Sequence, residues 1–334
     1  EEPVFEALIA DLKAGAITRE IGKVGTRLNY EKSGMRSMIT SSARKSKKVK
    51  EGPYKPIVLK MHKKWKDLET WTVIKRNTSA YTIGYYLNAV DLKINKSGEI
   101  VRQPENRQIY GKLFLRTFAI SMAITIICII LAYPISYLLA TMPLRYSNLL
   151  MIFVLLPFWT SLLVRTTAWI AMLQSQGVLN DLFVFFGFID DANRLQLIYN
   201  LTGTIIAMTH ILLPFMVLPL YSVMKTIPPT YMRAALSLGA NPFVAFVRVY
   251  MPQTLSGIGA GSILVFILSI GYYITPALVG GTGGTLISNQ IAYHMQSSLN
   301  WGLAGALGAL LLGSVLALYT LYNKIVGIDN MKLG

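Results

Sequence analysis

The sequence predicts an all-α polytopic membrane protein whose first third is polar and basic, and three observations support this prediction. Hydrophobic residues make up 53% of the 334 positions, and charged residues make up only 14%, whereas soluble domains are about a quarter charged. Residues 1–111 hold 22 of the 32 Lys and Arg and 12 of the 16 Asp and Glu. The remainder contains long apolar stretches. We therefore expect a polar domain at 1–111 and a membrane-embedded domain at 112–334.

Five apolar stretches are long enough to cross a bilayer as helices of about 20 residues. The second is interrupted by Pro157 and by Arg165. The expected spans cover about 113–139, 149–173, 201–223, 258–277 and 304–322.

The short loops between these stretches predict the orientation. The loops at 140–148 and 224–257 and the C-terminal tail carry six Lys or Arg, whereas the loops at 174–200 and 278–300 carry only Arg194. Basic loops remain in the cytoplasm. We therefore expect a multi-pass protein of the bacterial inner membrane, with the 228–257 loop and the C-terminus cytoplasmic.

This orientation places residues 1–111 in the periplasm despite their net charge of +10. Long segments cross membranes largely regardless of charge, but this one needs a preceding span to export it. We therefore expect a further helix upstream of Glu1, which would make six spans with the five visible ones.

The segment 1–111 is expected to form a mixed periplasmic cap. A short amphipathic helix is predicted at its start from the spacing of Phe5, Leu8, Ile9 and Leu12. The basic run from Ser41 to Lys50 resembles patches that bind nucleic acid or lipid headgroups, but no aromatic residues interleave with its charges, which favours a solvated linker. Trp71–Ile74 is typical of a strand, and Asn95–Gly98 is typical of a turn.

The loop at 228–257 carries signals for two short helices. Thr230 is a candidate N-cap for a helix from Tyr231 to Leu238, and Gly239 suits the positive φ at a helix C-terminus. Asn241 can cap a second helix that has Pro242 at its first position. The expected apolar face of that second helix consists of Phe243, Phe246, Val247 and Tyr250.

Two short helices joined at a glycine would form a rigid projection with a slim tip of small residues. Such a projection suits the helix-in-groove mode of recognition. An amphipathic connector lying on the lipid surface is the alternative, and the local physics does not separate the two.

This loop resembles the EAA loop of ABC-importer permeases, whose pattern is Glu-Ala-Ala, three residues, Gly, and a Pro further on. The matching positions are Ala234, Ala235, Gly239, Ala240, Phe246, Val249, Pro252 and Gly257. Four further segments resemble the spermidine/putrescine branch of these permeases, and the resemblance covers about 110–325. They are Ala132–Tyr137, Pro157–Ser161 with Arg165 and Thr166, Gly177–Asn180, and Thr275–Gly281.

The resemblance implies a type I ABC-importer permease core and a role in polyamine import. It further implies three kinds of partner: a dimer of ABC ATPases, a second permease subunit and a periplasmic binding protein, with membrane lipid around them and no nucleic acid. Whether the permease pair is a homodimer or a heterodimer is left open. Permeases for opines, amino-acid derivatives or aminophosphonates are similar, so these substrates are alternatives.

The residues implied to contact the ATPase lie in the EAA-like loop. The family usually has Glu where this chain has Arg233, so the charge at that position is reversed. The full set is Arg233, Ala234, Ala235, Ser237, Gly239, Ala240, Phe243 and Phe246.

Polar and aromatic residues within the spans are candidates for the substrate path. Arg165 is either a gate residue or a residue at the outer interface, where a helix broken near Pro157 would let it reach water. His210 can be a packing residue, and the tyrosines can be interfacial. The candidates are Phe158, Trp159, Arg165, Thr166, Trp169, His210, Tyr272 and Tyr273.

The sequence indicates no catalytic chemistry in this chain. Gly111-Lys112 lacks the hydroxyl residue and the upstream Gly of a phosphate-binding loop, so ATP and Mg²⁺ are expected on the partner ATPase, and no cofactor is expected here. Three dispersed His and a single Cys128 predict no metal site and no disulfide. The glycines at 280–284 are expected in a flexible outer loop.

Two other functional classes remain open at this stage. A receptor or scaffold would use residues 1–111 as a ligand-binding ectodomain. A secondary carrier would usually have carboxylates in its spans for ion coupling, and these spans have none. The EAA-like loop favours a permease over both.

Overall fold

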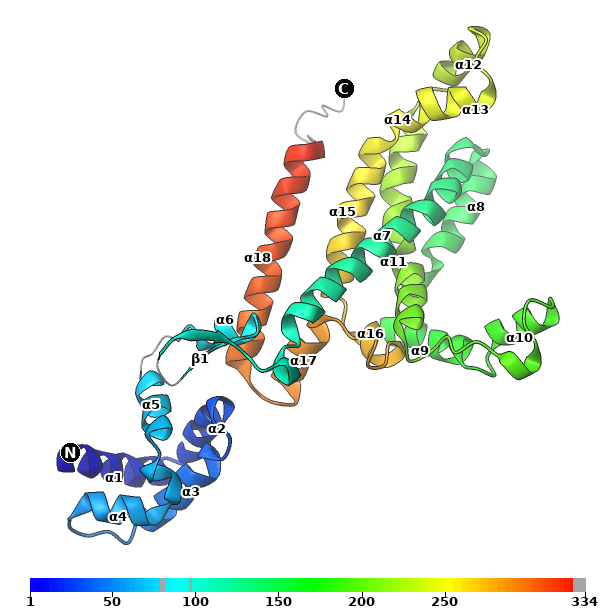
Figure 1. Cartoon of the computed structure of the whole chain (residues 1–334). Coiled ribbons are helices and arrows are strands. Elements are labelled where there is room, and N and C mark those ends of the chain that lie inside the picture. The colour runs from blue at the N-terminus through cyan, green and yellow to red at the C-terminus, as the bar shows by residue number, and fades with distance from the viewer. Residues whose placement is uncertain (79–81, 96–97, 327–334) are drawn as a thin grey trace. The chain divides into compact units, whose positions relative to one another are not determined.

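The computed structural model describes residues 1–78, 82–95 and 98–326, which fold as two compact units, Glu1–Pro104 (unit 1) and Glu105 onward (unit 2) (Figure 1). Unit 1 contains α1 (Glu2–Ile17), α2 (Ile21–Glu31), α3 (Met35–Ser46), α4 (Tyr54–Met61), η1 (Lys63–Lys66), α5 (Leu68–Arg76), α6 (Gly84–Ala89), β1 (Leu92–Ile94) and β2 (Ile100–Arg102). The domain boundary expected at residue 111 falls in the first turn of a helix that begins at Tyr110.

Unit 2 contains η2 (Glu105–Arg107), α7 (Tyr110–Thr141), α8 (Leu144–Leu155), η3 (Leu156–Trp159), α9 (Leu162–Leu173), α10 (Val178–Phe185), η4 (Asp191–Asn193), α11 (Leu201–Thr226), α12 (Pro229–Ser237), α13 (Pro242–Ala245), η5 (Phe246–Tyr250), α14 (Met251–Gln253), α15 (Leu255–Gly271), α16 (Ile274–Val279), α17 (Ile287–Gln296) and α18 (Trp301–Val326).

Unit 1 has its own hydrophobic core, built on the aromatic residues Phe5, Trp65 and Trp71. Trp65 is 1% exposed, and its Nε1 donates to Ser42 Oγ at 2.8 Å. Trp71 Nε1 donates to the Trp65 carbonyl at 2.9 Å. The helical spacing expected at the start is confirmed by α1, which buries Phe5, Ile9 and Leu12.

Two predictions for unit 1 are wrong. Trp71–Ile74 lies in α5, where Asp67 Oδ1 accepts from the Glu69 N–H and caps the helix. Thr70 and Val73 face the core from successive turns, so capping and packing outweigh the strand preference of a Thr-Val-Ile run. Most of the expected linker at 41–50 lies in α3, which buries small side chains, Ser42, Ala43 and Ser46 among them.

The two strands of unit 1 form an antiparallel hairpin in which Leu92 pairs with Arg102. The turn predicted at 95–98 connects them. Gly98 has φ +88° and donates its N–H to the Asn95 carbonyl, while residues 96–97 lie outside the described part of the chain.

His62 makes the stability of unit 1 depend on pH. Its Nδ1 accepts from the Lys64 N–H at 3.2 Å. Burial, together with the charges of Lys64, Lys45 and Lys63, holds the pKa of His62 below its ordinary 6.5. Since the unfolded chain then binds this proton more tightly, the free energy of unfolding of unit 1 should fall as the pH drops through about 6.5.

Hydrogen exchange of the α3 amides measures this effect in the full chain, after correction for intrinsic exchange rates. We expect the free energy of opening to be smaller at pH 5.5 than at pH 7.5. The matched variant His62→Asn keeps a side-chain acceptor for Lys64 but does not titrate, so it should lose most of this difference. An equal difference in both proteins would contradict the assignment.

The centre of unit 2 is formed by α7, α11 and α15, which pack against one another (Figure 1). Their buried residues include Ile124 and Cys128 of α7, Met216 of α11 and Val265 of α15. Gly257 allows the close approach of α15 to α11, since a Cβ at this position would lie 3.1 Å from Leu220 Cα. This trio provides the rigid frame for the surfaces described below.

Within the described part of unit 2, three helices are individually long and apolar enough to cross a membrane, and there are up to five spans if each bent helix pair counts as one. The three are α7, α11 and the 301–324 part of α18, which match the first, third and fifth expected stretches. The all-α membrane architecture is therefore confirmed, while the second and fourth expected stretches are not single helices. A further bend of 58°, between 242–253 and 255–271, precedes the fourth stretch.

The second stretch is broken between α8 and α9, with a bend of 99° across the pair 144–159 and 162–185. Pro157 cannot donate a backbone hydrogen bond, and Ser161 Oγ caps the new helix by accepting from the Val164 N–H at 3.2 Å. The fourth stretch also differs, because α15 ends at Gly271 and α16 is a separate short helix.

The loop expected at 174–200 contains a helix of its own, α10. Arg194 holds this loop together, because its guanidinium lies 2.7 Å from both Asp181 and Asp191 and donates to the Ser175 carbonyl at 3.0 Å. Phe185 and Phe186 on and after α10 are strongly exposed.

Candidate coupling surface and transmembrane path

The 228–257 loop forms two short helices joined at Gly239, and its local signals explain the shape. Gly239 has φ +88°. The Gly239 N–H donates to the Leu236 carbonyl at 3.0 Å, and the Ala240 N–H donates to the Ala235 carbonyl at 3.1 Å. These two bonds form the left-handed closure that glycine allows at a helix end. The first helix begins at Pro229 rather than at Tyr231, with Pro228 at its N-cap position in place of Thr230.

The second helix begins as the sequence predicts. Asn241 Oδ1 accepts from the Val244 N–H at 2.8 Å, and Pro242 occupies the first position. Its continuation through Phe246–Tyr250 is a short π-helical stretch. The chain then runs through α14 into α15, so the elbow is continuous with the frame of unit 2.

Four rings, which we call the aromatic anchor, fix this elbow to the frame: Tyr133 and Tyr137 of α7, and Phe246 and Tyr250 of η5. The Phe246 ring lies 5.3 Å from that of Tyr137 and 6.0 Å from that of Tyr133, both edge-on. The Tyr250 ring lies 5.3 Å from that of Tyr137. Leu220 and Met224 of α11 complete the cluster. In the sequence, residues 132–137 were noted only for their resemblance to the permease branch, and no role was predicted for Tyr133 or Tyr137.

The predicted apolar face of the second helix is partly wrong. Phe246 and Tyr250 pack inward, but Phe243 is 74% exposed, and Val247 is also exposed. The π-helical stretch changes the angular spacing, so Phe243 and Val247 no longer share the inward face of Phe246 and Tyr250.

The outer side of the elbow is exposed and partly apolar. Leu238 is 89% exposed, and Tyr231 and Leu236 are also exposed. Ala234 and Ser237 lie on the surface of α12, and Ala235 and Ala240 are half-buried. Arg233 is exposed, and no carboxylate of the described residues lies within ion-pair distance of it. Figure 1 shows α12 and α13 at one end of the frame and α9 and α16 at the other.

Four of the predicted path residues come together on α9 and α11. Trp169 Nε1 donates to His210 Nδ1 at 3.1 Å, and the two rings are edge-on with centroids 5.2 Å apart. Thr166 Oγ1 bonds Thr275 Oγ1 at 3.2 Å and thereby links α9 to α16. Tyr272 follows the last residue of α15 and lies three positions before Thr275. We call Arg165, Thr166, Trp169, His210 and Tyr272 the polar group of the path.

Arg165 is the unusual member of the polar group. Its side chain is half-buried, and its Nε is buried with no hydrogen-bond partner in the described structure. A buried guanidinium nitrogen without an acceptor is costly. The helix break near Pro157, which the interfacial interpretation of Arg165 requires, is present.

The other path candidates lie elsewhere. Phe158 packs edge-on against Phe215 of α11 at 4.9 Å, whereas Trp159 is 88% exposed. Tyr273 is 38% exposed, and its carbonyl accepts from Asn289 Nδ2 at 2.8 Å. Tyr273 directly follows Tyr272, but no side-chain hydrogen bond or ring contact among the described residues joins Phe158, Trp159 or Tyr273 to the polar group.

A chain of buried side-chain hydrogen bonds, which the sequence did not indicate, joins α7 to α17. The Tyr110 hydroxyl lies 2.9 Å from His294 Nε2, and His294 Nδ1 lies 2.8 Å from Ser298 Oγ. The partners are separated by 184 positions, so no local pattern could reveal the pair.

The 280–284 segment is not a free outer loop, so that prediction is wrong. The Tyr199 N–H donates to the Val279 carbonyl at 2.8 Å, and a Cβ on Gly281 would lie 2.3 Å from the Tyr199 carbonyl oxygen. Gly280 and Gly284 each lie close to Thr204 Oγ1. The glycines allow two backbones to pack closely at the start of α11.

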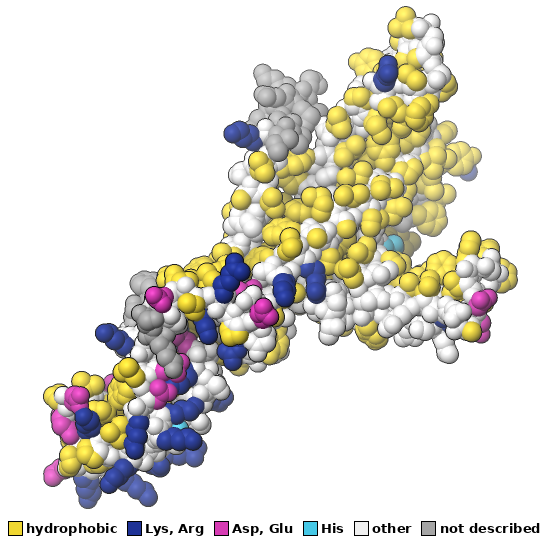
Figure 2. Space-filling model, in the orientation of Figure 1, with side chains coloured by type: hydrophobic (Ala, Val, Ile, Leu, Met, Phe, Trp, Pro, Cys, Tyr) yellow, Lys and Arg dark blue, Asp and Glu magenta, His cyan; other side chains and the backbone are white. Residues whose placement is uncertain are grey.

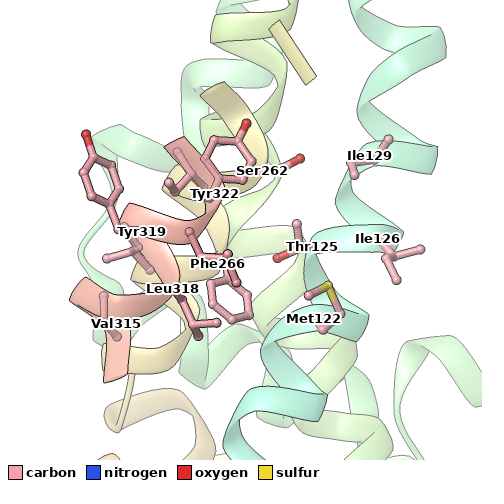
Figure 3. Close-up of a pocket in the computed structure, with 13 residues that line it drawn as sticks. Met122, Thr125, Ile126, Ile129, Ser262, Phe266, Val315, Leu318, Tyr319 and Tyr322 are labelled. Atoms are coloured by element: carbon pink, nitrogen blue, oxygen red, sulfur yellow. The ribbon is translucent and has the colours of Figure 1, made fainter. Parts of the chain in front are cut away.

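A cavity of about 350 Å³ lies between α7, α15 and α18 (Figure 3). Ser262 and Thr125 are among its few polar residues, and their hydroxyls already donate to backbone carbonyls. An ammonium group moved there would meet aromatic rings but no carboxylate, so the loss of its hydration would not be balanced by a counter-charge. Figure 3 labels Met122, Ile126, Ile129, Phe266, Val315, Leu318, Tyr319 and Tyr322 around it.

The described residues contain no group of three His, Cys, Asp or Glu placed to hold a metal ion. Cys128 is buried and unpaired in α7.

Comparison with known proteins identifies the family. Residues 132–326 match the family of binding-protein-dependent transport system inner membrane components. The spermidine/putrescine transport system permease protein PotB of Escherichia coli K12 is 31% identical over 228 residues, covering 66% of this chain and 82% of that protein. PotB of Haemophilus influenzae is 32% identical over 221 residues, covering 65% and 77% respectively.

A solved structure shares the fold. A chain of the bacterial alginate ABC transporter in complex with an alginate pentasaccharide-bound periplasmic protein superposes with a TM-score of 0.51 at 15% identity, over 65% of this chain and 77% of that one. The family match and the similarity to PotB show that the chain is a multi-pass membrane protein and belongs to the family of binding-protein-dependent transport system inner membrane components, as a permease subunit of an ABC importer.

Proposed function

We propose that this chain provides half of the transmembrane path of an ATP-driven importer for polyamines such as spermidine and putrescine. A second permease subunit would provide the other half, and a dimer of ABC ATPases would bind ATP and Mg²⁺. A periplasmic binding protein would deliver the solute. The similarity to PotB supports the polyamine substrate, and the exposed elbow of α12 and α13 supports the ATPase partner.

The elbow is the observation that carries the proposal. Its tip has Leu238 exposed to 89% and Phe243 to 74%, which is unfavourable for groups that face only water. A groove on an ATPase would cover them. We propose that this elbow, the 140–148 loop and the C-terminal tail lie in the cytoplasm and residues 1–111 in the periplasm, and the positive-inside count supports this orientation.

Transmission of the ATPase movement follows from the aromatic anchor. Closure of the ATPase dimer would displace α12 and α13, and the contacts of Phe246 and Tyr250 with Tyr133 and Tyr137 would pass this displacement to α7. Because α7, α11 and α15 pack as one frame, the polar group at the opposite end would then change its environment. Differential contact in the two states drives such a transition.

The polar group is better suited to the passage of a polyamine than to binding it tightly. Trp169 and Tyr272 offer ring faces, which attract ammonium groups. The expected spans contain no Asp or Glu, and Arg165 repels a cation. We infer that the binding protein sets substrate affinity, while Arg165 acts as a gate that excludes free cations until the path opens.

The substrate assignment predicts the response of the purified complex. Its ATPase activity should rise several-fold with binding protein loaded with spermidine or putrescine, and much less with the unloaded protein. The same measurement with opines, amino-acid derivatives and aminophosphonates tests the alternatives. Stimulation by sugars or inorganic anions, without stimulation by amines, would overturn the polyamine assignment and leave the permease assignment in place.

A further inference from the structure

The positive charge of unit 1 is concentrated in one third of its length. Residues 32–66 hold twelve Lys and Arg and a single acidic residue, Glu51. Residues 1–31 hold four basic and six acidic residues, so they are slightly negative. The excess charge of unit 1 therefore belongs to α3, α4, η1 and their connections.

Folding places this charge on one surface. The inward sides of α3 and α4 carry Met38, Ile39, Val58 and Met61, so their basic side chains point outward. Lys45 Nζ donates to the Met61 carbonyl at 2.6 Å, which holds α3 against the end of α4. Figure 2 shows dark blue Lys and Arg atoms crowded along one side of unit 1.

Most of these cations have no acidic partner. Lys32 pairs with Asp67 and Glu69, and Lys55 pairs with Glu1. The other ten have no carboxylate within ion-pair distance among the residues that the structure describes, and we call them the basic surface. They are Arg36, Arg44, Lys45, Lys47, Lys48, Lys50, Lys60, Lys63, Lys64 and Lys66.

The charges of the basic surface act on His62, which lies in the same segment. Burial first, and then the charges of Lys64, Lys45 and Lys63, lower the pKa of His62. A folded domain that keeps ten cations together without counter-charges is stabilised by anything anionic that neutralises them.

We propose that the basic surface of unit 1 docks on the anionic phospholipid headgroups of the bilayer that the chain itself crosses. The chain runs from Pro104, the last residue of unit 1, to Tyr110, the first residue of α7, in six residues. Even fully extended, this connection reaches only about 20 Å. The bilayer surface is therefore present at high effective concentration for unit 1.

The composition of the basic surface fits headgroups better than other anions. Eight of its ten cations are Lys, which act as flexible point charges rather than as bidentate forks for defined carboxylates. Single-stranded nucleic acid is usually bound with exposed aromatic rings, whereas Trp65, the tryptophan among these lysines, is 1% exposed.

Lysine labelling of the full-length chain in nanodiscs tests the proposal. One nanodisc contains only phosphatidylcholine, and the other contains about 30% phosphatidylglycerol to provide negative surface potential. We expect Lys47, Lys48 and Lys63 to react with an acetylating reagent about fivefold more slowly in the anionic disc. This protection should disappear near 1 M NaCl, where the Debye length is about 3 Å. Lys23 and Lys75, which lie outside the basic surface, should react equally in both discs.

A charge-reversed variant and a matched control sharpen the test. The triple variant Lys47→Glu, Lys48→Glu, Lys63→Glu should leave Lys45 and Lys66 equally reactive in both discs. The control Lys23→Glu, Lys75→Glu, Lys93→Glu changes the charge equally at exposed positions and should retain the protection. Hydrogen exchange of the α3 amides verifies that both variants remain folded.

Equal labelling of the wild-type chain in the two discs would overturn the proposal. Protection that appears only after an acidic polypeptide or an oligonucleotide is added would also overturn it and would identify a macromolecular partner instead. No substrate, ATPase or binding protein takes part, so either outcome leaves the transport proposal untouched.

Discussion

Replacing Gly281 by Val should prevent the membrane unit from reaching its normal stability. Gly281 has φ +54°, a conformation that disfavours a β-branched residue. A Cβ at this position would also lie 2.3 Å from the Tyr199 carbonyl oxygen and 2.8 Å from its carbonyl carbon, both part of the backbone. Strain and overpacking together should cost about 3 kcal/mol or more.

Thermal unfolding of the purified chain in detergent, followed by size-exclusion chromatography, measures this cost. For a unit of this size, about 3 kcal/mol corresponds to a fall in Tm of roughly 6–12 °C. Gly283→Val is the matched control, since a Cβ there would meet nothing within 4 Å. If both variants unfold at the same temperature as the wild type, the close packing of 279–284 against residue 199 is wrong.

Reversing the charge at Arg233 should weaken the coupling between ATPase and permease. Arg233 is exposed on α12 and has no partner within the described chain, so Arg233→Glu should leave the fold intact. The family pattern has Glu at this position, so the proposed ATPase partner is expected to carry a compensating acid opposite Arg233. Like charges at a contact are strongly unfavourable, so ATP-driven transport should fall by about tenfold.

The control for this prediction lies on the same elbow. Arg248→Glu introduces the same charge change at another exposed position, and it should affect transport much less. A basic residue introduced at the facing acid of the ATPase should restore activity to Arg233→Glu. Unchanged transport in Arg233→Glu would show that the side chain is merely solvated.

The elbow could be predicted from sequence because its signals are local. Gly239 at the turn and Asn241 with Pro242 at the next N-terminus act within four residues of themselves, and the structure has both features. The prediction of the apolar face of the second helix was partly wrong because that face is determined by contacts with distant residues. Phe246 and Tyr250 of its π-helical stretch pack against Tyr137 of α7, more than 100 positions earlier, and no local pattern shows this contact.

The same distinction explains the other differences. Trp71–Ile74 has strand-like composition, but the cap at Asp67 and burial of Val73 form a helix. The contacts of Trp169 with His210 and of Thr166 with Thr275 join positions 41 and 109 apart, so the sequence named the residues but could not pair them. From the sequence, the glycines at 280–284 were predicted to form a free loop, because no local pattern shows that Tyr199 packs against them.

The most direct test of the account is ATP-driven uptake into proteoliposomes that contain this chain, its partner permease and the ATPase, with loaded binding protein outside. We predict that radiolabelled spermidine accumulates inside only with ATP, and that accumulation falls sharply in Arg233→Glu. Accumulation that is independent of ATP, or that is equal when this chain is left out, would contradict a coupled permease.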